Sequence, residues 1–232
     1  MSASIRFLAF TAAVGLLACS PESPADPVPR TATVEPMADH AMTGATPAGT
    51  QADVPAPALQ AALRSLWNGH VVHTRDYALA MHADDRAAAD AAADAVVANA
   101  RQIGDAVAGF YGEAGGARML ELLGGHWGAV KALTDAEHAG DTAARNRAIG
   151  DLTANAGDIA AFLASANPNL AEDAVNGLLV AHGGHHVQQV QQVMAGEMAA
   201  EAETWVAMQA HMDVIADALA AAIAAQFPDQ AA

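Results

Sequence analysis

Apolar residues recur every three or four positions along nearly all of the chain beyond residue 57. Around Trp67, for example, this spacing brings Leu63, Leu66 and Trp67 onto one face of a helix. No stretch shows the strict alternation or the density of β-branched residues that is typical of a strand. The pattern therefore predicts an all-α fold.

Short polar or glycine-containing segments interrupt this pattern and divide it into about six helices of roughly 22–28 residues each. The interruptions are His82-Ala83-Asp84, Tyr111-Gly112, Ala139-Gly140-Asp141, Asn167-Pro168-Asn169 and Ala195-Gly196. Asp and Asn favour the position before a helix, and Gly favours the position after one. We therefore expect N-caps at Asp84, Asp141 and Asn169, and C-caps at Gly112, Gly140 and Gly196.

The sequence repeats itself with an interval of 56 residues, at His70, His126 and His182, each preceded four positions earlier by a leucine. A second series lies 29 residues beyond these histidines, at Asn99, Asn155 and His211. Agreement in two registers indicates three copies of a helical hairpin. We predict a six-helix antiparallel up-down bundle built from three repeated hairpins, with an open α-solenoid of the same hairpins as the second possibility.

Four histidines of this repeat fall on the apolar stripe of their helices and near the middle of each helix: His70, His126, His182 and His211. Antiparallel packing brings the midpoints of helices to one height, so we expect these rings to form a buried layer. Glycines next to them, such as Gly69 and Gly125, allow a close backbone approach or leave room for a bound group.

Neutral imidazoles that converge from several helices bind copper or zinc, and the layer therefore predicts a metal site with His70, His126, His182 and His211 as ligands. Further candidates are close in sequence or in the repeat: His73, His185, His186, Asn99, Asn155 and Met208. The absence of a Glu-x-x-His pair argues against a carboxylate-bridged di-iron centre. The alternative is a packing device, in which His–Asn hydrogen bonds set the register of an alanine-rich bundle.

The amino terminus, MSASIRFLAFTAAVGLLACS, has an early charge at Arg6 and an apolar run that ends just before Cys19, the single cysteine. This run is too short to span a bilayer, and its pattern predicts a lipoprotein signal peptide over residues 1–18 with lipidation of Cys19. The residue after Cys19 is Ser20 and not Asp, and this resembles known lipoprotein sorting signals, which implies the outer membrane. Residues 19–57 hold eight of the ten prolines and form a predicted disordered tether, which leaves 58–228 as the helical domain.

The formal net charge of −16 argues against nucleic acid as a partner, because phosphate would be repelled, whereas cations would be tolerated. The expected contacts of the chain are the membrane, through the lipid anchor, and a metal ion. Nothing in the sequence identifies a protein partner.

Several short motifs resemble a family of exported bacterial all-helical proteins that has no established activity. They are Leu66-Trp67 with His70-Val71 and Thr74-Arg75, Tyr111-Gly112, Ala154-Asn155-Ala156 with Ile159-Ala160-Ala161-Phe162-Leu163, Ala166-Asn167-Pro168 and Gln226-Phe227-Pro228. The resemblance covers most of 66–228 and includes His126, His182 and His211, whereas His73, His185 and His186 depart from the family pattern. It implies an exported helical fold. A glycosyltransferase label carried by some members is not supported, because the chain lacks the α/β architecture of such enzymes.

These observations together predict a lipoprotein on the periplasmic face of the outer membrane that binds copper or zinc through a buried histidine layer, for sequestration, delivery or sensing. The alternative is a structural or ligand-binding helical lipoprotein without a metal. An enzyme ranks third, because no general base lies on the histidine stripe.

Overall fold

The computed structural model describes residues 56–231, which fold into six helices and contain no strand, so the predicted all-α class is confirmed. The helices are α1 (Pro57–His82), α2 (Arg86–Ala139), α3 (Thr142–Ala166), α4 (Glu172–Ala195), α5 (Met198–Gln226) and the short α6 (Pro228–Ala231). The predicted signal peptide, the lipidation site Cys19 and nearly all of the predicted tether lie outside the described residues.

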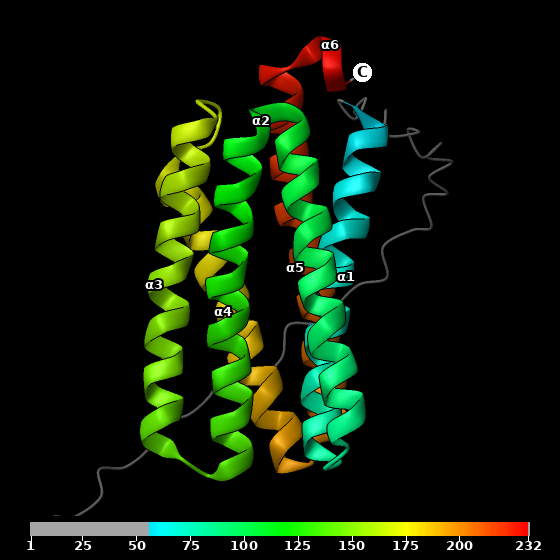
Figure 1. The fold of residues 1–232 in the computed structure, drawn as a ribbon, viewed down its shortest axis with the longest axis vertical. Coiled ribbons are helices and arrows are strands. Elements are labelled where there is room, and N and C mark those ends of the chain that lie inside the picture. The colour runs from blue at the N-terminus through cyan, green and yellow to red at the C-terminus, as the bar shows by residue number, and fades with distance from the viewer. Residues whose placement is uncertain (1–55, 232) are drawn as a thin grey trace, which may run out of the picture. The chain divides into compact units, whose positions relative to one another are not determined.

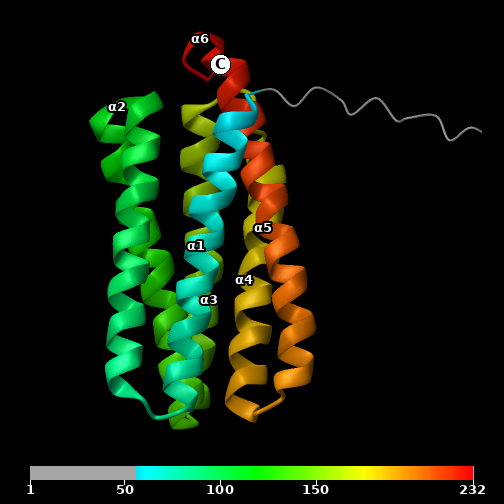
Figure 2. The same ribbon diagram turned by 90° about the vertical axis from the view of Figure 1, so that its right-hand side faces the viewer.

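Helix α2 differs from the expected pattern because the break at Tyr111-Gly112 is a kink inside one 54-residue element. The backbone at Gly112 leaves the helical region, with φ 74° and ψ 171°, a conformation that glycine adopts readily and other residues rarely do. Figures 1 and 2 show that α2 folds back here, so that its two lengths, residues 86–111 and 113–139, lie side by side.

Three of the five other predicted caps are found in the structure, and two are not. The Asp141 side chain caps α3 by accepting a backbone N–H at 2.9 Å. Gly140 and Gly196 end their helices in the left-handed region, with φ 68° and 73°. The cap of α2 is Asp85 rather than the predicted Asp84, whose φ is 56°. Asn169 does not cap α4 either, because the residue at that position is Ala171.

The long helices lie along the long axis of the bundle, each packed against the next in the chain, and α5 packs back against α1 (Figures 1 and 2). An open solenoid would leave the first and last helices apart, and here they are in contact. Helix α4 also contacts α1 and α2 across the centre. Side chains at the middle of α1, α2 and α4 therefore face one another.

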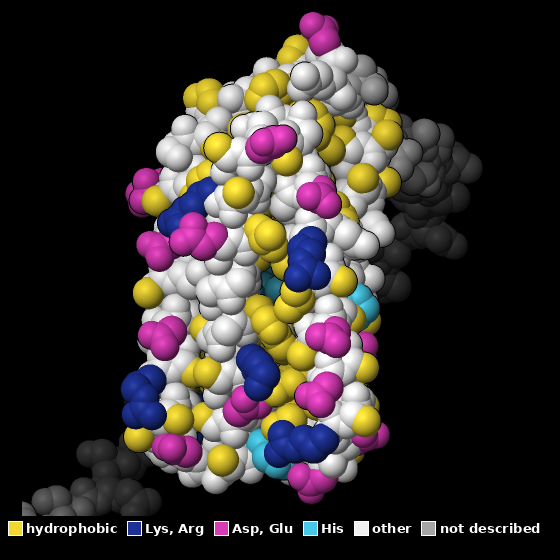
Figure 3. All heavy atoms as spheres, viewed as in Figure 1, with side chains coloured by type: hydrophobic (Ala, Val, Ile, Leu, Met, Phe, Trp, Pro, Cys, Tyr) yellow, Lys and Arg dark blue, Asp and Glu magenta, His cyan; other side chains and the backbone are white. Residues whose placement is uncertain are grey.

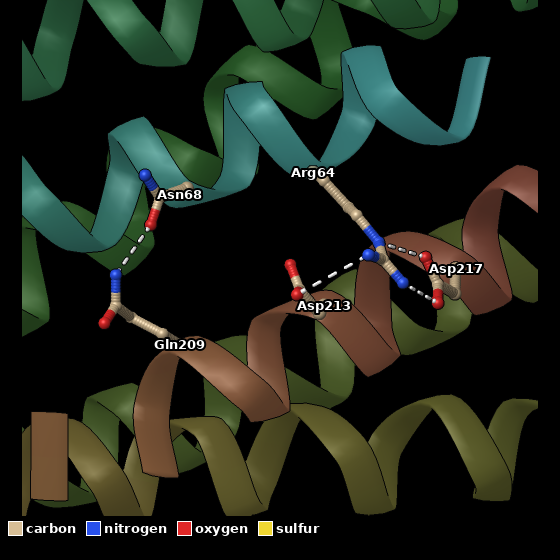
Figure 4. A network of polar contacts seen from close by, with 5 residues as sticks. All are labelled: Arg64, Asn68, Gln209, Asp213 and Asp217. Atoms are coloured by element: carbon tan, nitrogen blue, oxygen red, sulfur yellow. Dashed lines mark hydrogen bonds and ion pairs between the residues drawn. The ribbon is translucent and has the colours of Figure 1, made fainter. Parts of the chain in front are cut away.

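Polar contacts at the surface accompany the closure of α5 onto α1. Arg64 donates two hydrogen bonds to Asp217, at 2.7 and 2.6 Å, and Gln209 donates to Asn68 at 3.2 Å (Figure 4). Exposed pairs of this kind contribute less than about 1 kcal/mol. Burial of apolar side chains is the larger stabilising term, and the core between α1 and α5 includes Val71 and Met212.

Among residues 56–231, α5 is the one helix that is long and apolar enough to cross a membrane, judged by length and composition. In this fold it packs against α1 and α4, and 44% of its most apolar window is buried inside the bundle. The face shown in Figure 3 carries scattered acidic side chains around a central line of hydrophobic ones along α2.

The two lengths of α2 approach each other closely at two glycines, Gly104 and Gly116. A Cβ on Gly116 would lie 2.6 Å from the carbonyl oxygen of Gly104 and 2.7 Å from the Ala108 Cβ. We therefore expect Gly116→Ala to lower the free energy of unfolding by about 1–3 kcal/mol through overpacking, as measured by urea denaturation.

Gly124→Ala is the matched control in the same helix, because nothing lies within 4 Å of the added Cβ. It should raise the free energy of unfolding by about 0.8–1 kcal/mol through helix propensity alone. Equal stability of the Gly116 variant and the wild type would contradict the close approach at Gly116.

Candidate metal centre

Four histidines from three helices meet at the centre of the bundle. His70 comes from α1, His126 from the second length of α2, and His182 and His186 from α4. All four side chains are buried, with exposed fractions between 1% and 5%. Each histidine offers one ring nitrogen, and these four nitrogens all lie within 4.8 Å of one another. They are close enough to surround a single ion.

The two histidines of α4 are already at ligand spacing. Their positions differ by four residues, which places both rings on one face of the helix, and the two Nε2 atoms are 3.1 Å apart. For metal–nitrogen bonds of 2.0–2.1 Å, two nitrogens of a tetrahedral site are about 3.3 Å apart. The rings of His70 and His126 lie farther out, with centroids 5.5–5.9 Å from those of α4, so a bound ion requires a small inward shift of these two.

Several ring nitrogens have no hydrogen-bond partner in the described part of the chain. These are Nε2 of His70, Nε2 of His126 and Nδ1 of His182. A buried polar atom without a partner is costly, at roughly 1–3 kcal/mol. Unpaired nitrogens that gather at one place therefore indicate either a missing ligand or a functional site.

Burial also decides the charge of the four rings. Desolvation is the main cause that lowers the pKa of His70 to about 3 and that of His126 to about 4. Burial, followed by repulsion from neighbouring histidines, holds the pKa values of His182 and His186 well below the usual range. All four rings are neutral at pH 7, which is the form that binds a metal.

The structure brings together three of the four predicted ligands, His70, His126 and His182, and replaces the fourth. The prediction for His211 needs correction: its ring is half-buried and lies outside the group, with Nε2 2.9 Å from the Leu178 carbonyl oxygen. His186, predicted only as an additional candidate, completes the group. Its i, i+4 spacing from His182 is the sequence signal that identifies it.

The second series of the repeat explains the position of His211. Asn99 and Asn155 each donate the side-chain N–H to a carbonyl 33 residues earlier, at 3.0 Å, and the Oδ1 atoms of both are buried without a hydrogen-bond partner among residues 56–231. His211 makes the same bond over the same separation of 33 residues. This position therefore joins the two helices of a hairpin.

Glycines next to the histidines make room for two of these bonds. A Cβ on Gly69 would lie 2.9 Å from Asn99 Nδ2, and one on Gly125 would lie 3.0 Å from Asn155 Nδ2. Gly184, by contrast, has nothing within 4 Å of an added Cβ. The space at Gly69 and Gly125 is therefore taken up by an asparagine side chain, and not by the neighbouring backbone or the bound group that the sequence led us to expect.

The remaining candidates lie outside the four-nitrogen group. His73 and His185 are half-buried, and the ring of His185 packs against that of His211 at 5.4 Å between centroids. Met208 is fully buried in an apolar cluster that also contains Trp67 and Ile215.

Among residues 56–231, no carboxylate belongs to the four-histidine group. The most deeply buried carboxylate, Glu201, accepts two hydrogen bonds from Arg75 at 2.6 and 2.8 Å and one from Gln189 at 2.9 Å. Arg75 lowers the pKa of Glu201, and their charges balance each other. Among the histidines, cysteines and carboxylates of residues 56–231, the four imidazoles are therefore the ligands that the site offers, and all four are uncharged.

A small apolar cavity of about 30 Å³ reaches three of the four rings, those of His70, His126 and His182. Its other walls are apolar side chains such as Leu123 and Ile159, together with Trp67, whose Nε1 has no partner. A space of this size holds about one or two water molecules. The cluster thus has room beside it for a small ligand but not for a large one.

Comparison of the chain with protein-family models, with curated proteins and with solved structures finds no match. The resemblance to exported helical proteins stays a prediction. A function for this chain therefore has to come from the geometry of its own residues.

The lowered pKa values predict how the stability of the metal-free chain depends on pH. The unfolded histidines have a pKa near 6.5, so below this pH the unfolded state takes up protons that the folded state refuses. Stability is full above about pH 6.5 and falls as the pH decreases, by up to about 1.4 kcal/mol per pH unit for each of the four histidines. Urea unfolding in the presence of a chelator, between pH 7.5 and 5, measures this slope.

The control for this measurement is His126→Leu, which removes one titrating ring and should reduce the slope by about 1.4 kcal/mol per pH unit. Glu201 contributes little to this slope above pH 5, because the hydrogen bonds from Arg75 lower its pKa from an ordinary value of 4.5, so that it titrates below pH 5 in both the folded and the unfolded state. A stability that is constant from pH 7.5 to 5 would refute the neutral, desolvated state of the cluster.

Proposed function

We propose that this chain binds one transition-metal ion, copper or zinc, through His70, His126, His182 and His186. The observation that carries the proposal is the convergence of four buried neutral imidazoles, one nitrogen of each within 4.8 Å of the others. Nitrogen ligands in a near-tetrahedral set suit Zn²⁺ and copper, whereas Mg²⁺ and Ca²⁺ require oxygen ligands.

The packing alternative makes a different demand on the same residues. It requires the rings to be hydrogen-bonded one by one to Asn99, Asn155 or the backbone. The side-chain N–H groups of both asparagines donate to the carbonyls of Leu66 and Leu122. Of the two, Asn155 also interacts with a ring of the cluster, that of His126, whose pKa it raises. Three nitrogens of the cluster stay unpartnered in the part of the chain that the structure describes. A metal ion would satisfy the two unpartnered Nε2 atoms at once, and this favours the metal over the packing device.

The uncharged ligand set also ranks the two metals. No carboxylate of residues 56–231 offsets the charge of the ion, so the bound ion keeps its full charge in a dry core. The Born cost of removing water rises with the square of the charge and is about four times smaller for Cu⁺ than for Zn²⁺. Of the two, Cu⁺ therefore suits the site better.

We further propose that the bundle is an up-down arrangement of three repeated hairpins, with the two lengths of α2 as separate helices and α6 as a tail. The support is the recurrent bond from Asn99, Asn155 and His211, which spans 33 residues each time and recurs with the period of 56 residues. The sequence adds the proposal of a lipoprotein anchored through Cys19 at the periplasmic face of the outer membrane. A metal site on a tethered domain suits sequestration, delivery or sensing there.

The first test is the metal content of the full chain, purified in detergent and dialysed against a mild chelator. We expect close to one equivalent of copper or zinc by elemental analysis, and none in the double variant His126→Ala, His182→Ala. Saturating metal at 100 times its Kd should stabilise the wild type by about 2.7 kcal/mol, seen as a rise in Tm, and leave the double variant unchanged. A wild-type Tm that neither metal raises would favour the packing device instead.

A second test separates the two candidates for the fourth ligand. His186→Val copies Val130, its counterpart one repeat earlier, and should weaken metal binding by at least about tenfold. His211→Asn copies Asn155 and should leave the equilibrium affinity unchanged. Chelator competition measures both, and the opposite pattern would restore His211 as the ligand.

A further inference from the structure

A second pair of histidines lies next to the buried cluster, on the outer side of α4 and α5. The rings of His185 and His211 are half-buried, with centroids 5.4 Å apart and planes inclined by 53°. Two imidazoles at this separation form a partial coordination site that is open to incoming ligands.

The hydrogen bond of His211 prepares its ring for this role. A carbonyl oxygen only accepts, so the Nε2 atom that lies 2.9 Å from Leu178 O carries the hydrogen. In the neutral ring, Nδ1 then carries the free lone pair. Metal-bound histidines almost always donate their other N–H in this way, which fixes the tautomer and the orientation of the ring.

The hairpin does not need a histidine for this bond. Asn99 and Asn155 make the same bond in the first two hairpins, so the imidazole of His211 adds a nitrogen that the bond between helices does not require. The third hairpin also carries an alanine, Ala181, where the first two have glycines that an asparagine amide approaches at 2.9–3.0 Å. Ala181 therefore accompanies the change from asparagine to histidine at position 211.

An open hollow of about 240 Å³ is lined in part by His185 and gives solvent access to this member of the pair. Polar side chains make up most of its wall, including Gln188, Glu203 and Thr204, and Gln192, whose Oε1 is buried without a partner. Together with the net charge of −16, these oxygens favour the approach of a cation.

The pair is also connected to the buried cluster. His185 precedes His186 directly on α4, so that one ring points outward and the next inward. Adjacent positions of α4 thus carry one ring that lines the surface hollow and one ring that belongs to the buried cluster.

We infer that His185 and His211 form a loading site, which holds the incoming Cu⁺ or Zn²⁺ before it moves to the four buried histidines. This inference rests on the proposed function, since a loading site requires a destination. A fully hydrated ion cannot enter the buried cluster without losing its water, and two imidazoles at the surface would replace part of that water first. The site therefore acts on the rate of loading and not on the final affinity.

The test replaces the pair by the residues of the other hairpins, as His185→Ala, His211→Asn and Ala181→Gly combined. These changes copy Ala129, Asn155 and Gly125 of the second hairpin, and the bond to Leu178 O is kept. Stopped-flow mixing of the full chain with Zn²⁺ alone, followed by tryptophan fluorescence, measures the loading rate. We expect loading at least tenfold slower, with release slowed by the same factor and with stoichiometry and Kd unchanged.

The matched control is His73→Ala, at the position that corresponds to His185 in the first hairpin, where Asn99 stands in place of His211. It should load at the wild-type rate. Loading of the triple variant at the wild-type rate overturns the inference while the buried site stands. Loss of a separate, second equivalent of metal also overturns it, because the pair would then be an independent site. A wild-type chain that binds no metal overturns the proposed function itself.

Discussion

Desolvation of four imidazole rings governs the centre of this bundle. Protonation of any of them would place a charge next to three other rings, in a group that contains no carboxylate from residues 56–231, and burial accordingly lowers their pKa values. The rings remain neutral and present lone pairs instead of charges. A cation that accepts nitrogen ligands can use these lone pairs, and few other groups can satisfy them together.

The frame that holds this layer consists of bonds between paired helices. In each hairpin, one polar side chain donates to a backbone carbonyl of the preceding helix, 33 residues earlier, and thereby sets the height of one helix against the other. Because His70, His126 and His182 stand at equal places in this frame, equal heights follow for them. The polar bonds therefore align the ligands without belonging to the site.

The third hairpin departs from the other two at the residues that matter most for chemistry. His186 stands where the first two hairpins have Thr74 and Val130, and it adds the fourth ring to a layer of three. His211 stands where they have asparagines, and it adds a second ring beside His185. The three hairpins share three equivalent histidines, His70, His126 and His182. The further histidines of the buried cluster and of the surface pair all lie on α4 and α5, so the repeat is asymmetric in its chemistry.

The sequence by itself determined the helical class, most of the helix ends, the repeat and the inward direction of His70, His126 and His182, because periodicity and capping are local properties of a chain. The sequence did not show that His186, and not His211, is the fourth member of the group. Both residues belong to the third hairpin, and which of them faces the centre depends on how α4 and α5 pack against the other helices. The sequence predicted a break in the helical pattern at Gly112, where α2 folds back. It did not predict that the two lengths of α2 meet at Gly104 and Gly116. Only the tertiary structure decided which nitrogens share a point, because a distance between side chains on different helices follows from packing and not from spacing along the chain.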